Sequence, residues 1–202
     1  MRVLVLEIFW AGIHSACLSF NAAFLIRLGG SNLHVSLLSA GAALVIAVTT
    51  IPFAALMDRT SRRRTWIVGS LFTARLLYAL LIFVPWLPDG RASVMVGVVL
   101  GLNIAASLFS AGWLPLMGEV VPLARRARLF ASRNIVLGAT VSIATLLLGR
   151  WLELAPFPLN YQMLYGLSVF TSMVSTWYVA QVNMPELPVA DPQAVKKTQP
   201  RN

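Results

Sequence analysis

Six apolar runs, each about 20 residues long, dominate the sequence, and short polar segments separate them. The runs cover Val3–Ile26, Val35–Met57, Trp66–Leu87, Ala92–Gly118, Asn134–Leu152 and Tyr161–Val182. A helix needs about 20 mostly apolar residues to cross a hydrocarbon core of about 30 Å. Because lipid offers no hydrogen bonds to the backbone, each run is predicted to cross the membrane as a helix. The sequence therefore predicts an all-α, polytopic membrane protein with six transmembrane helices.

The amino-acid composition agrees with a membrane protein and excludes several soluble classes. Hydrophobic residues make up 58% of the chain and charged residues 11%, whereas soluble domains carry about 25% charged residues. The net charge of +9 does not indicate a nucleic-acid partner, because the apolar excess places the chain in the lipid bilayer. The sequence contains no HExxH motif, acidic metal cluster, P-loop or dinucleotide fingerprint. We therefore expect no catalytic residue, metal or cofactor, and the chain is not predicted to be an enzyme.

Short connections join the predicted helices and set their arrangement. Turn-forming residues stand at Gly29–Gly30, Pro88–Gly90 and Pro156–Pro158, and such short links place neighbouring helices antiparallel. The six-helix transmembrane domain is predicted to span residues 1–182. From Asn183 the sequence becomes polar and contains proline, so residues 183–202 are predicted to form a cytoplasmic tail or linker.

The distribution of basic residues predicts how the helices are oriented. Of the 16 Lys and Arg residues, twelve fall on the side that carries both termini, three on the other side, and one, Arg75, inside a run. The twelve are Arg2, Arg59, Arg62, Arg63, Arg64, Arg125, Arg126, Arg128, Arg133, Lys196, Lys197 and Arg201. Basic residues accumulate on the cytoplasmic side of membrane proteins. We therefore expect an integral protein of the cytoplasmic (inner or plasma) membrane with both termini in the cytoplasm.

An acidic residue followed by a basic cluster lies directly after the second run. The segment Ala54–Arg64 reads AALMDRTSRRR. It resembles the signature loop between helices two and three of the major facilitator superfamily of secondary transporters. Two positions differ, since Ala54 and Ser61 stand where that family usually has glycine. The basic segment Val121–Arg128 resembles the family's loop between helices four and five.

The resemblance covers roughly residues 8–182 and implies a half bundle built as a 3+3 repeat. Such a bundle equals the N-terminal half of a complete carrier, so transport would require a second six-helix half or a homodimer. The resemblance also implies a cytoplasmic latch, in which an acid and nearby bases hold helix ends together in the outward-open state. The residues at the matching positions are Asp58, Arg59, Arg62, Arg63 and, as a carboxylate partner on the fourth helix, Glu119.

Polar residues inside the runs are candidates for a solute pathway, because burying them in lipid is costly. Arg75 lies near the bilayer middle with no acid at its depth, so its guanidinium suits an anionic solute or the carboxylate of a partner chain. The resemblance implies that the first and fourth helices face the cavity. The candidates on those helices are Ser19, Asn21, Asn103 and Ser107. Close helix packing is the alternative role for the serines.

Two further ionisable residues in the first run are expected to serve structure. Glu7 lies near the cytoplasmic end of the run, within reach of the interface or of a surface base. His14 lies in the middle of the run, without an acid or a second histidine nearby. It is expected to pack there through hydrogen bonds.

Two classes of function remain open. The first is a secondary-transporter half that moves a small solute of unknown identity by alternating access, together with a second half or a second copy. The second is a non-transporting membrane subunit or assembly factor that uses the same fold to bind another membrane protein. Absence of solute flux in liposomes would speak against the first class, and a stoichiometric complex with an unrelated membrane protein would favour the second.

Overall fold

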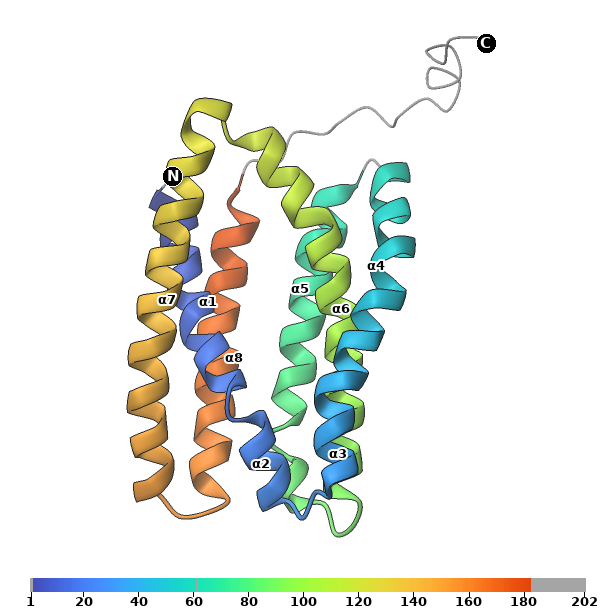
Figure 1. The fold of residues 1–202 in the computed structure, drawn as a ribbon, viewed down its shortest axis with the longest axis vertical. Coiled ribbons are helices and arrows are strands. Elements are labelled where there is room, and N and C mark those ends of the chain that lie inside the picture. The colour runs from blue at the N-terminus through green and yellow to red at the C-terminus, as the bar shows by residue number, and fades with distance from the viewer. Residues whose placement is uncertain (1, 61, 183–202) are drawn as a thin grey trace.

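The structure, a computed structural model, describes residues 2–60 and 62–182, and all regular structure in this part is helical. Each predicted run corresponds to one rod of helix, and consecutive rods run antiparallel (Figure 1). A π-helical turn, η1, lies within the second rod, and a short 3-10 turn, η2, follows the third. The elements in chain order are α1 Arg2–Leu18, α2 Asn21–Arg27, α3 Asn32–Ser36, η1 Leu37–Gly41, α4 Ala42–Arg59, α5 Arg63–Leu80, η2 Val84–Trp86, α6 Arg91–Val120, α7 Leu123–Leu154 and α8 Leu159–Ala180.

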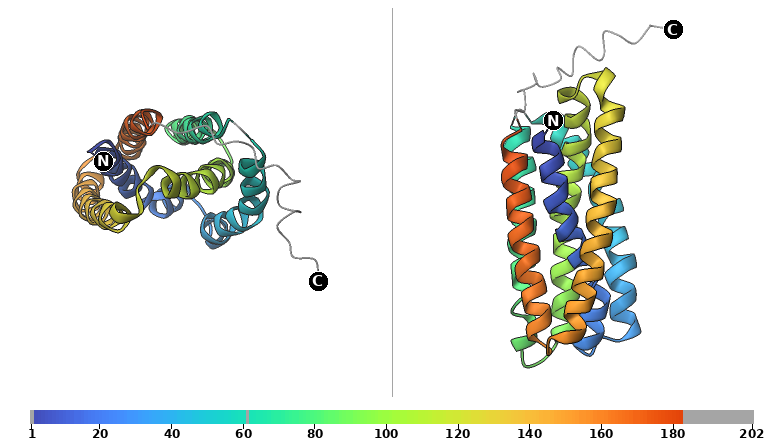
Figure 2. Two further views of the ribbon diagram at one scale, coloured as in Figure 1. Left: turned by 90° about the horizontal axis from the view of Figure 1, so that it is seen from above. Right: turned by 90° about the vertical axis from the view of Figure 1, so that its left-hand side faces the viewer.

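The rods form two rows. Seen from above, α8 and α5 lie on one side, and α7, α1, α6 and α4 form a longer row on the other (Figure 2). Helix α1 packs against both α8 and α7, and helix α6 packs against both α5 and α4. Helices α5 and α8 also contact each other. The central helices of the long row are therefore α1 and α6, and its edges are α7 and α4.

The two ends of the bundle differ in charge. The α4–α5 and α6–α7 connections lie at the same end as the start of α1 (Figure 1). We call this end the basic end, because the helix termini there carry Arg59, Arg62, Arg63, Arg64, Arg125, Arg126 and Arg128. The opposite end, the turn end, carries tight connections in which Gly29 and Gly90 adopt φ values of 85° and 69°. Glycine adopts such positive values without the steric penalty that a side chain would bring.

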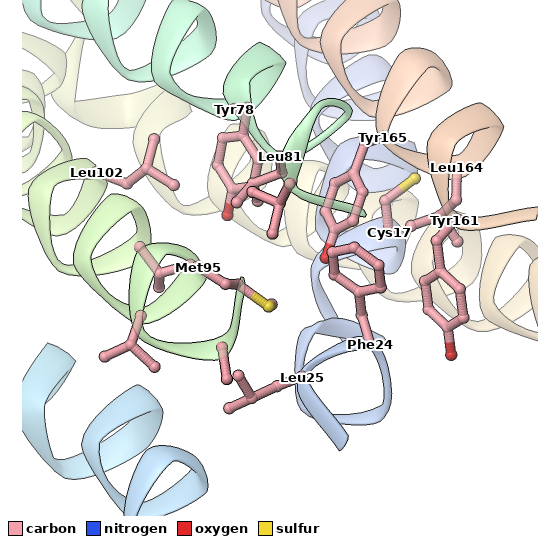
Figure 3. Packing of buried hydrophobic residues seen from close by; sticks show 14 of the residues in the cluster. Cys17, Phe24, Leu25, Tyr78, Leu81, Met95, Leu102, Tyr161, Leu164 and Tyr165 are labelled. Atoms are coloured by element: carbon pink, nitrogen blue, oxygen red, sulfur yellow. The ribbon is translucent and has the colours of Figure 1, made fainter. Parts of the chain in front are cut away.

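Two clusters of buried apolar residues hold the rows together. At the turn end, the Phe24 ring of α2 stacks on Tyr161 of α8, with 4.8 Å between ring centroids, and also contacts Tyr165 (Figure 3). The second cluster, toward the basic end, takes residues from six helices: Leu4, Met57, Ile67, Met117, Leu129 and Val179. Each cluster therefore joins helices of both rows.

Three helix boundaries differ from the predicted ones. The first rod is interrupted at Ser19–Phe20, and the third helix ends at Leu80 rather than Leu87. Helix α7 begins at Leu123, well before the predicted Asn134, so most of the expected basic loop is helical. Ala, Leu and Arg are good helix formers, and hydropathy does not detect a helix that continues past the membrane.

Five rods in the described part of the chain are long and apolar enough to cross a membrane: Val3–Arg27, Asn32–Arg59, Arg63–Trp86, Arg91–Gly118 and Leu123–Leu154. They correspond to the first five predicted runs. Helix α8 occupies the place of the sixth run but is not among these five. Its hydropathy is lowered by hydroxyl side chains that are buried in the bundle: Ser168, Thr171, Ser172, Ser175 and Thr176. The six-span topology, including a span at α8, stays a prediction.

Candidate functional site

A cavity of about 370 Å³ lies where α1 and α2 meet α5, α6 and the second rod. Its polar lining comes from Ser19, Asn21, Ser39, Tyr78 and Asn103, and its apolar lining includes leucine and valine side chains. Three of the five predicted cavity residues, Ser19, Asn21 and Asn103, thus line one space. The volume falls within the usual range for small-molecule sites, about 300–1,000 Å³.

The interruption of the first rod positions two of these residues. Ser19 and Phe20 form a tight turn between α1 and α2, and Asn21 follows as the first residue of α2. The Tyr165 hydroxyl of α8 donates a 2.9 Å hydrogen bond to Asn21 Oδ1. Asn103 Nδ2 donates to the Val99 carbonyl, one turn earlier in α6, at 2.8 Å. Both amides are therefore held in defined orientations by neighbouring groups.

Ser107, the fourth candidate on these helices, lies outside the cavity lining and contacts α4. It is buried on α6 and is not among the residues that line the cavity. Its hydroxyl lies 2.7 Å from the Thr49 hydroxyl of α4. The contact ties α4 to α6, as expected for the alternative of close helix packing.

Arg75 also lies outside the cavity lining, and its guanidinium is engaged by a neighbouring helix. Arg75 Nη1 lies 2.8 Å from His14 Nε2 of α1, and His14 Nδ1 lies 2.7 Å from Ser168 Oγ of α8. An arginine can only donate, so Nε2 accepts and the hydrogen of the neutral ring resides on Nδ1, which donates to Ser168. The buried His14 therefore packs through hydrogen bonds. Its ring also makes an edge-to-face contact with the ring of Tyr78, with 5.0 Å between centroids, and Tyr78 lines the cavity.

A buried ion pair joins α1 to α7, and sequence reasoning missed it. Glu7 Oε2 lies 2.8 Å from Arg133 Nη1, and both side chains are nearly inaccessible. The Ser175 hydroxyl of α8 donates to Glu7 Oε1 at 3.1 Å, and Arg133 Nη1 donates to the Leu4 carbonyl at 2.5 Å. Of the two expectations for Glu7, an interface or a surface base, the structure shows the base, but Arg133 is buried rather than at the surface. A clue in the sequence was an acid in one run and a base near the start of another.

The predicted latch residues gather at the basic end. Arg63 Nη2 lies 3.9 Å from Asp58 Oδ1, and Arg63 Nε donates to the Met57 carbonyl at the end of α4 at 2.9 Å. The Asp58 carboxylate is 79% exposed, so water screens this pair. The Arg59 and Arg62 side chains are exposed. Glu119 belongs to α6, but its side chain lies outside the described residues.

Close helix contact at the basic end comes from a glycine on α6 rather than from the loop. A Cβ at Gly112 would lie 2.7 Å from Ile67 of α5 and 3.2 Å from Met57 of α4. Three helices therefore meet at Gly112. This contact holds α4 and α5 together next to the segment where Ala54 and Ser61 replace the family's glycines.

Comparison with known proteins identifies the family. A family model described as Major Facilitator Superfamily matches residues 8–201. No curated protein and no solved structure matches the chain significantly. The matched segment covers nearly the whole sequence and agrees with the apolar helices of the fold and with the acid-base segment after the second rod. The chain therefore belongs to the major facilitator superfamily of membrane transporters.

Proposed function

We propose that the chain is the N-terminal six-helix half of a secondary carrier and moves a small solute by alternating access against a second half. That second half is a continuation of the same polypeptide, a separate polypeptide or a second copy of this chain. Residues 1–182 form the transmembrane half, with α8 as the sixth span and a 3+3 repeat, and residues 183–202 form a cytoplasmic linker. Membership of a transporter superfamily and the long row α7–α1–α6–α4, available to a facing half, support this proposal.

The cavity beside the α1–α2 break is the proposed contact region for the solute. The observation that carries this assignment is that Ser19, Asn21 and Asn103, which come from two different rods, line the same 370 Å³ space. Among the described residues, those that line the cavity include hydroxyl and amide side chains but no charged one. Such a lining favours a neutral, hydrogen-bonding solute over an anion. Arg75 and Ser107 then support the site indirectly, Arg75 through His14 and Tyr78, and Ser107 through α4.

The basic end is the proposed latch. The Asp58–Arg63 pair links the two ends of the α4–α5 connection. The other members of the latch are Arg59, Arg62 and Glu119. As a set they hold helix ends together in the outward-open state. The wide exposure of Asp58 supports a contact that breaks and reforms at low cost during a transport cycle. The proposed orientation follows from the distribution of basic residues: the basic end and both chain termini face the cytoplasm.

Transport assays in liposomes test the proposal. The full chain is reconstituted alone and together with a candidate second half, and uptake is measured for labelled neutral solutes, such as sugars and polyols, and for labelled anions. We expect flux of a neutral solute in at least one pairing. In that pairing Asn103→Ala lowers uptake about tenfold or more, because a buried hydrogen bond to the solute is worth about 1.5 kcal/mol.

Asn134→Ala provides the matched control, since Asn134 is an exposed amide on α7 that lies outside the cavity lining. Its uptake is expected to equal that of the wild type. A folded chain that gives no flux in any pairing, but forms a stoichiometric complex with an unrelated membrane protein, would overturn the transport proposal in favour of a non-transporting subunit. Equal losses in the two asparagine variants would overturn the assignment of the cavity.

A further inference from the structure

A second cavity lies at the basic end, between α1 and the first turns of α7. Its volume is about 420 Å³, and it is lined by Val5, Arg125, Arg128, Leu129 and Ser132. Arg125 and Arg128 are exposed, stand three residues apart on α7 and so lie on neighbouring positions of one helix face. Among the described residues neither guanidinium has a hydrogen-bond or ion-pair partner. The cavity therefore combines two available positive groups with apolar walls.

The neighbouring arginines of α7 behave differently. Arg126 Nε donates to the Val121 carbonyl at 2.8 Å, and its Nη2 donates to Gly118 at the end of α6. Arg133 is buried and paired with Glu7. These two arginines face α6 and the interior of the bundle, where protein groups satisfy them. Arg125 and Arg128 lie on the other side of α7, away from α6, and no described residue pairs with their charge.

The side of α7 that carries Arg128 continues as an apolar stripe. Residues three, four, seven or eight positions apart lie on one side of a helix. Ile135, Ile143 and Leu146 follow Arg128 at successive separations of seven, eight and three residues. Their side chains are 71%, 60% and 76% exposed. In a membrane protein, an exposed stripe of large aliphatic side chains is solvated by lipid chains. The cavity with Arg125 and Arg128 lies at the end of this stripe.

The length of α7 places the two arginines at headgroup level. Its 32 residues span about 48 Å, whereas the hydrocarbon core is about 30 Å thick. At the turn end, the exposed Arg150–Glu153 ion pair marks the position of one interface. Counting back about 20 residues from Arg150 puts the other edge of the hydrocarbon near Phe130. Arg128 and Arg125 lie just beyond that edge, at the depth of lipid phosphates.

We propose that this cavity binds the headgroup phosphate of an anionic phospholipid, whose acyl chain runs along the Ile135–Leu146 stripe of α7. The guanidinium groups of Arg125 and Arg128 donate charge-assisted hydrogen bonds to the phosphate oxygens, a geometry that arginine matches with its planar fork of donors. Val5 and Leu129 contact the apolar part of the lipid next to the headgroup. The lipid fixes the edge helix α7 against α1 at the basic end.

Lipid titration of the purified full chain tests this site. Dansyl-labelled phosphatidylglycerol is titrated into the protein in a neutral detergent, and energy transfer from tryptophan to dansyl reports binding; dansyl-labelled phosphatidylcholine is the neutral comparison. We expect tighter binding of phosphatidylglycerol. The double variant Arg125→Gln/Arg128→Gln is expected to bind it about 30-fold more weakly, from the typical contribution of two surface arginines.

The variant Arg59→Gln/Arg62→Gln is the matched control, because it removes the same charge from exposed positions of the same end. It is expected to keep wild-type affinity. Equal affinity of the wild type for both lipids, or equal losses in the two double variants, would overturn the proposal. Full competition by millimolar inorganic phosphate or glycerol 1-phosphate would overturn the lipid assignment in favour of a soluble anion. Circular dichroism of each variant verifies that it is folded.

Discussion

At the scale of single residues, two buried ionisable groups of this bundle form an ion pair, whereas Arg75 has only a neutral hydrogen-bond partner. Glu7 is neutralised by Arg133, and its second oxygen accepts a hydrogen bond from Ser175. Arg75 Nη1 donates to the neutral ring of His14, and its buried Nε has no hydrogen-bond partner among the described residues. Removing one partner of a buried ion pair leaves an uncompensated charge, whereas replacing both partners by apolar residues is often neutral. The Glu7–Arg133 pair therefore maintains the packing of α1 against α7 and α8.

The Glu7–Arg133 pair gives a direct prediction for stability. Glu7→Gln is expected to lower the free energy of unfolding by about 3–5 kcal/mol, because Arg133 stays buried without its counter-charge. The double variant Glu7→Leu/Arg133→Leu is expected to recover most of that loss. Denaturant unfolding in detergent micelles, followed by circular dichroism, measures both effects.

The matched control for this prediction is Glu153→Gln. It breaks the Arg150–Glu153 pair, whose side chains are 71% and 70% exposed, and exposed pairs contribute less than about 1 kcal/mol. A Glu7→Gln protein that unfolds at the same denaturant concentration as this control would contradict the assigned role of the buried pair.

The sequence located part of the candidate site and missed the rest for physical reasons. Ser19, Asn21 and Asn103 stand out because a polar group within an apolar run is costly to bury in lipid, and such a residue can be recognised from the sequence alone. The partner of Glu7 cannot be recognised from the sequence, because the order of residues does not show that α1 packs beside α7. Arg133 was also counted as a loop residue, because an arginine at the start of a run resembles a topological signal.

At the scale of elements, helix contacts depend on a few positions without side chains. Gly112 brings α6 within contact distance of Ile67 and Met57, whereas a Cβ at Gly97, on the same helix, would meet no atom within 4 Å. The pattern of glycines in the sequence does not distinguish these two positions. Only the packing of α6 between α5 and α4 makes one of them essential.

Two alanine substitutions on α6 test this difference. Gly112→Ala is expected to destabilise the protein by about 1–3 kcal/mol, because its methyl group overlaps the fully buried Ile67. Gly97→Ala is expected to be neutral or to stabilise α6 by up to about 1 kcal/mol, since alanine is the better helix former. Thermal unfolding in detergent provides the comparison. Equal melting temperatures of the two variants would refute the close contact at Gly112.

Element boundaries show where hydropathy succeeds and where it fails. The long apolar runs marked five of the rods within a few residues at most boundaries, because burial in lipid requires uninterrupted apolar length. The break at Ser19–Phe20 and the early start of α7 were missed. Both features depend on local backbone geometry and helix propensity, and these properties have little effect on the hydropathy of the segment. The hydroxyl-rich α8 lies at the limit of the method, since its polar face is buried against α1.

At the scale of the whole molecule, the orientation of the bundle can be measured with single cysteines. The only native cysteine, Cys17, is buried, so little labelling of the native chain by a maleimide is expected. We expect a membrane-impermeant maleimide to label Asp89→Cys, at the turn end, in intact cells. Ala124→Cys, at the basic end, is expected to react only after permeabilisation, because the basic end faces the cytoplasm in the proposed orientation.

Both positions are exposed, so accessibility of the thiol to the reagent is matched. Labelling of both variants after permeabilisation serves as the positive control. The reverse pattern, with Ala124→Cys labelled in intact cells, would invert the orientation and would place the proposed latch on the outer side.

The Glu7–Arg133 pair joins an early and a late element of the chain, which bears on the order in which the bundle can be completed during synthesis. The ribosome delivers α1 first and α7 only after α4, α5 and α6, so Glu7 enters the bilayer long before its partner exists. Until α7 arrives, Glu7 lacks the base that compensates its charge, and an unpaired acid is costly to bury in lipid. Insertion of α7 supplies the missing charge and draws the first and fifth rods together. An unpaired carboxylate in the first rod therefore distinguishes an unfinished bundle from a finished one.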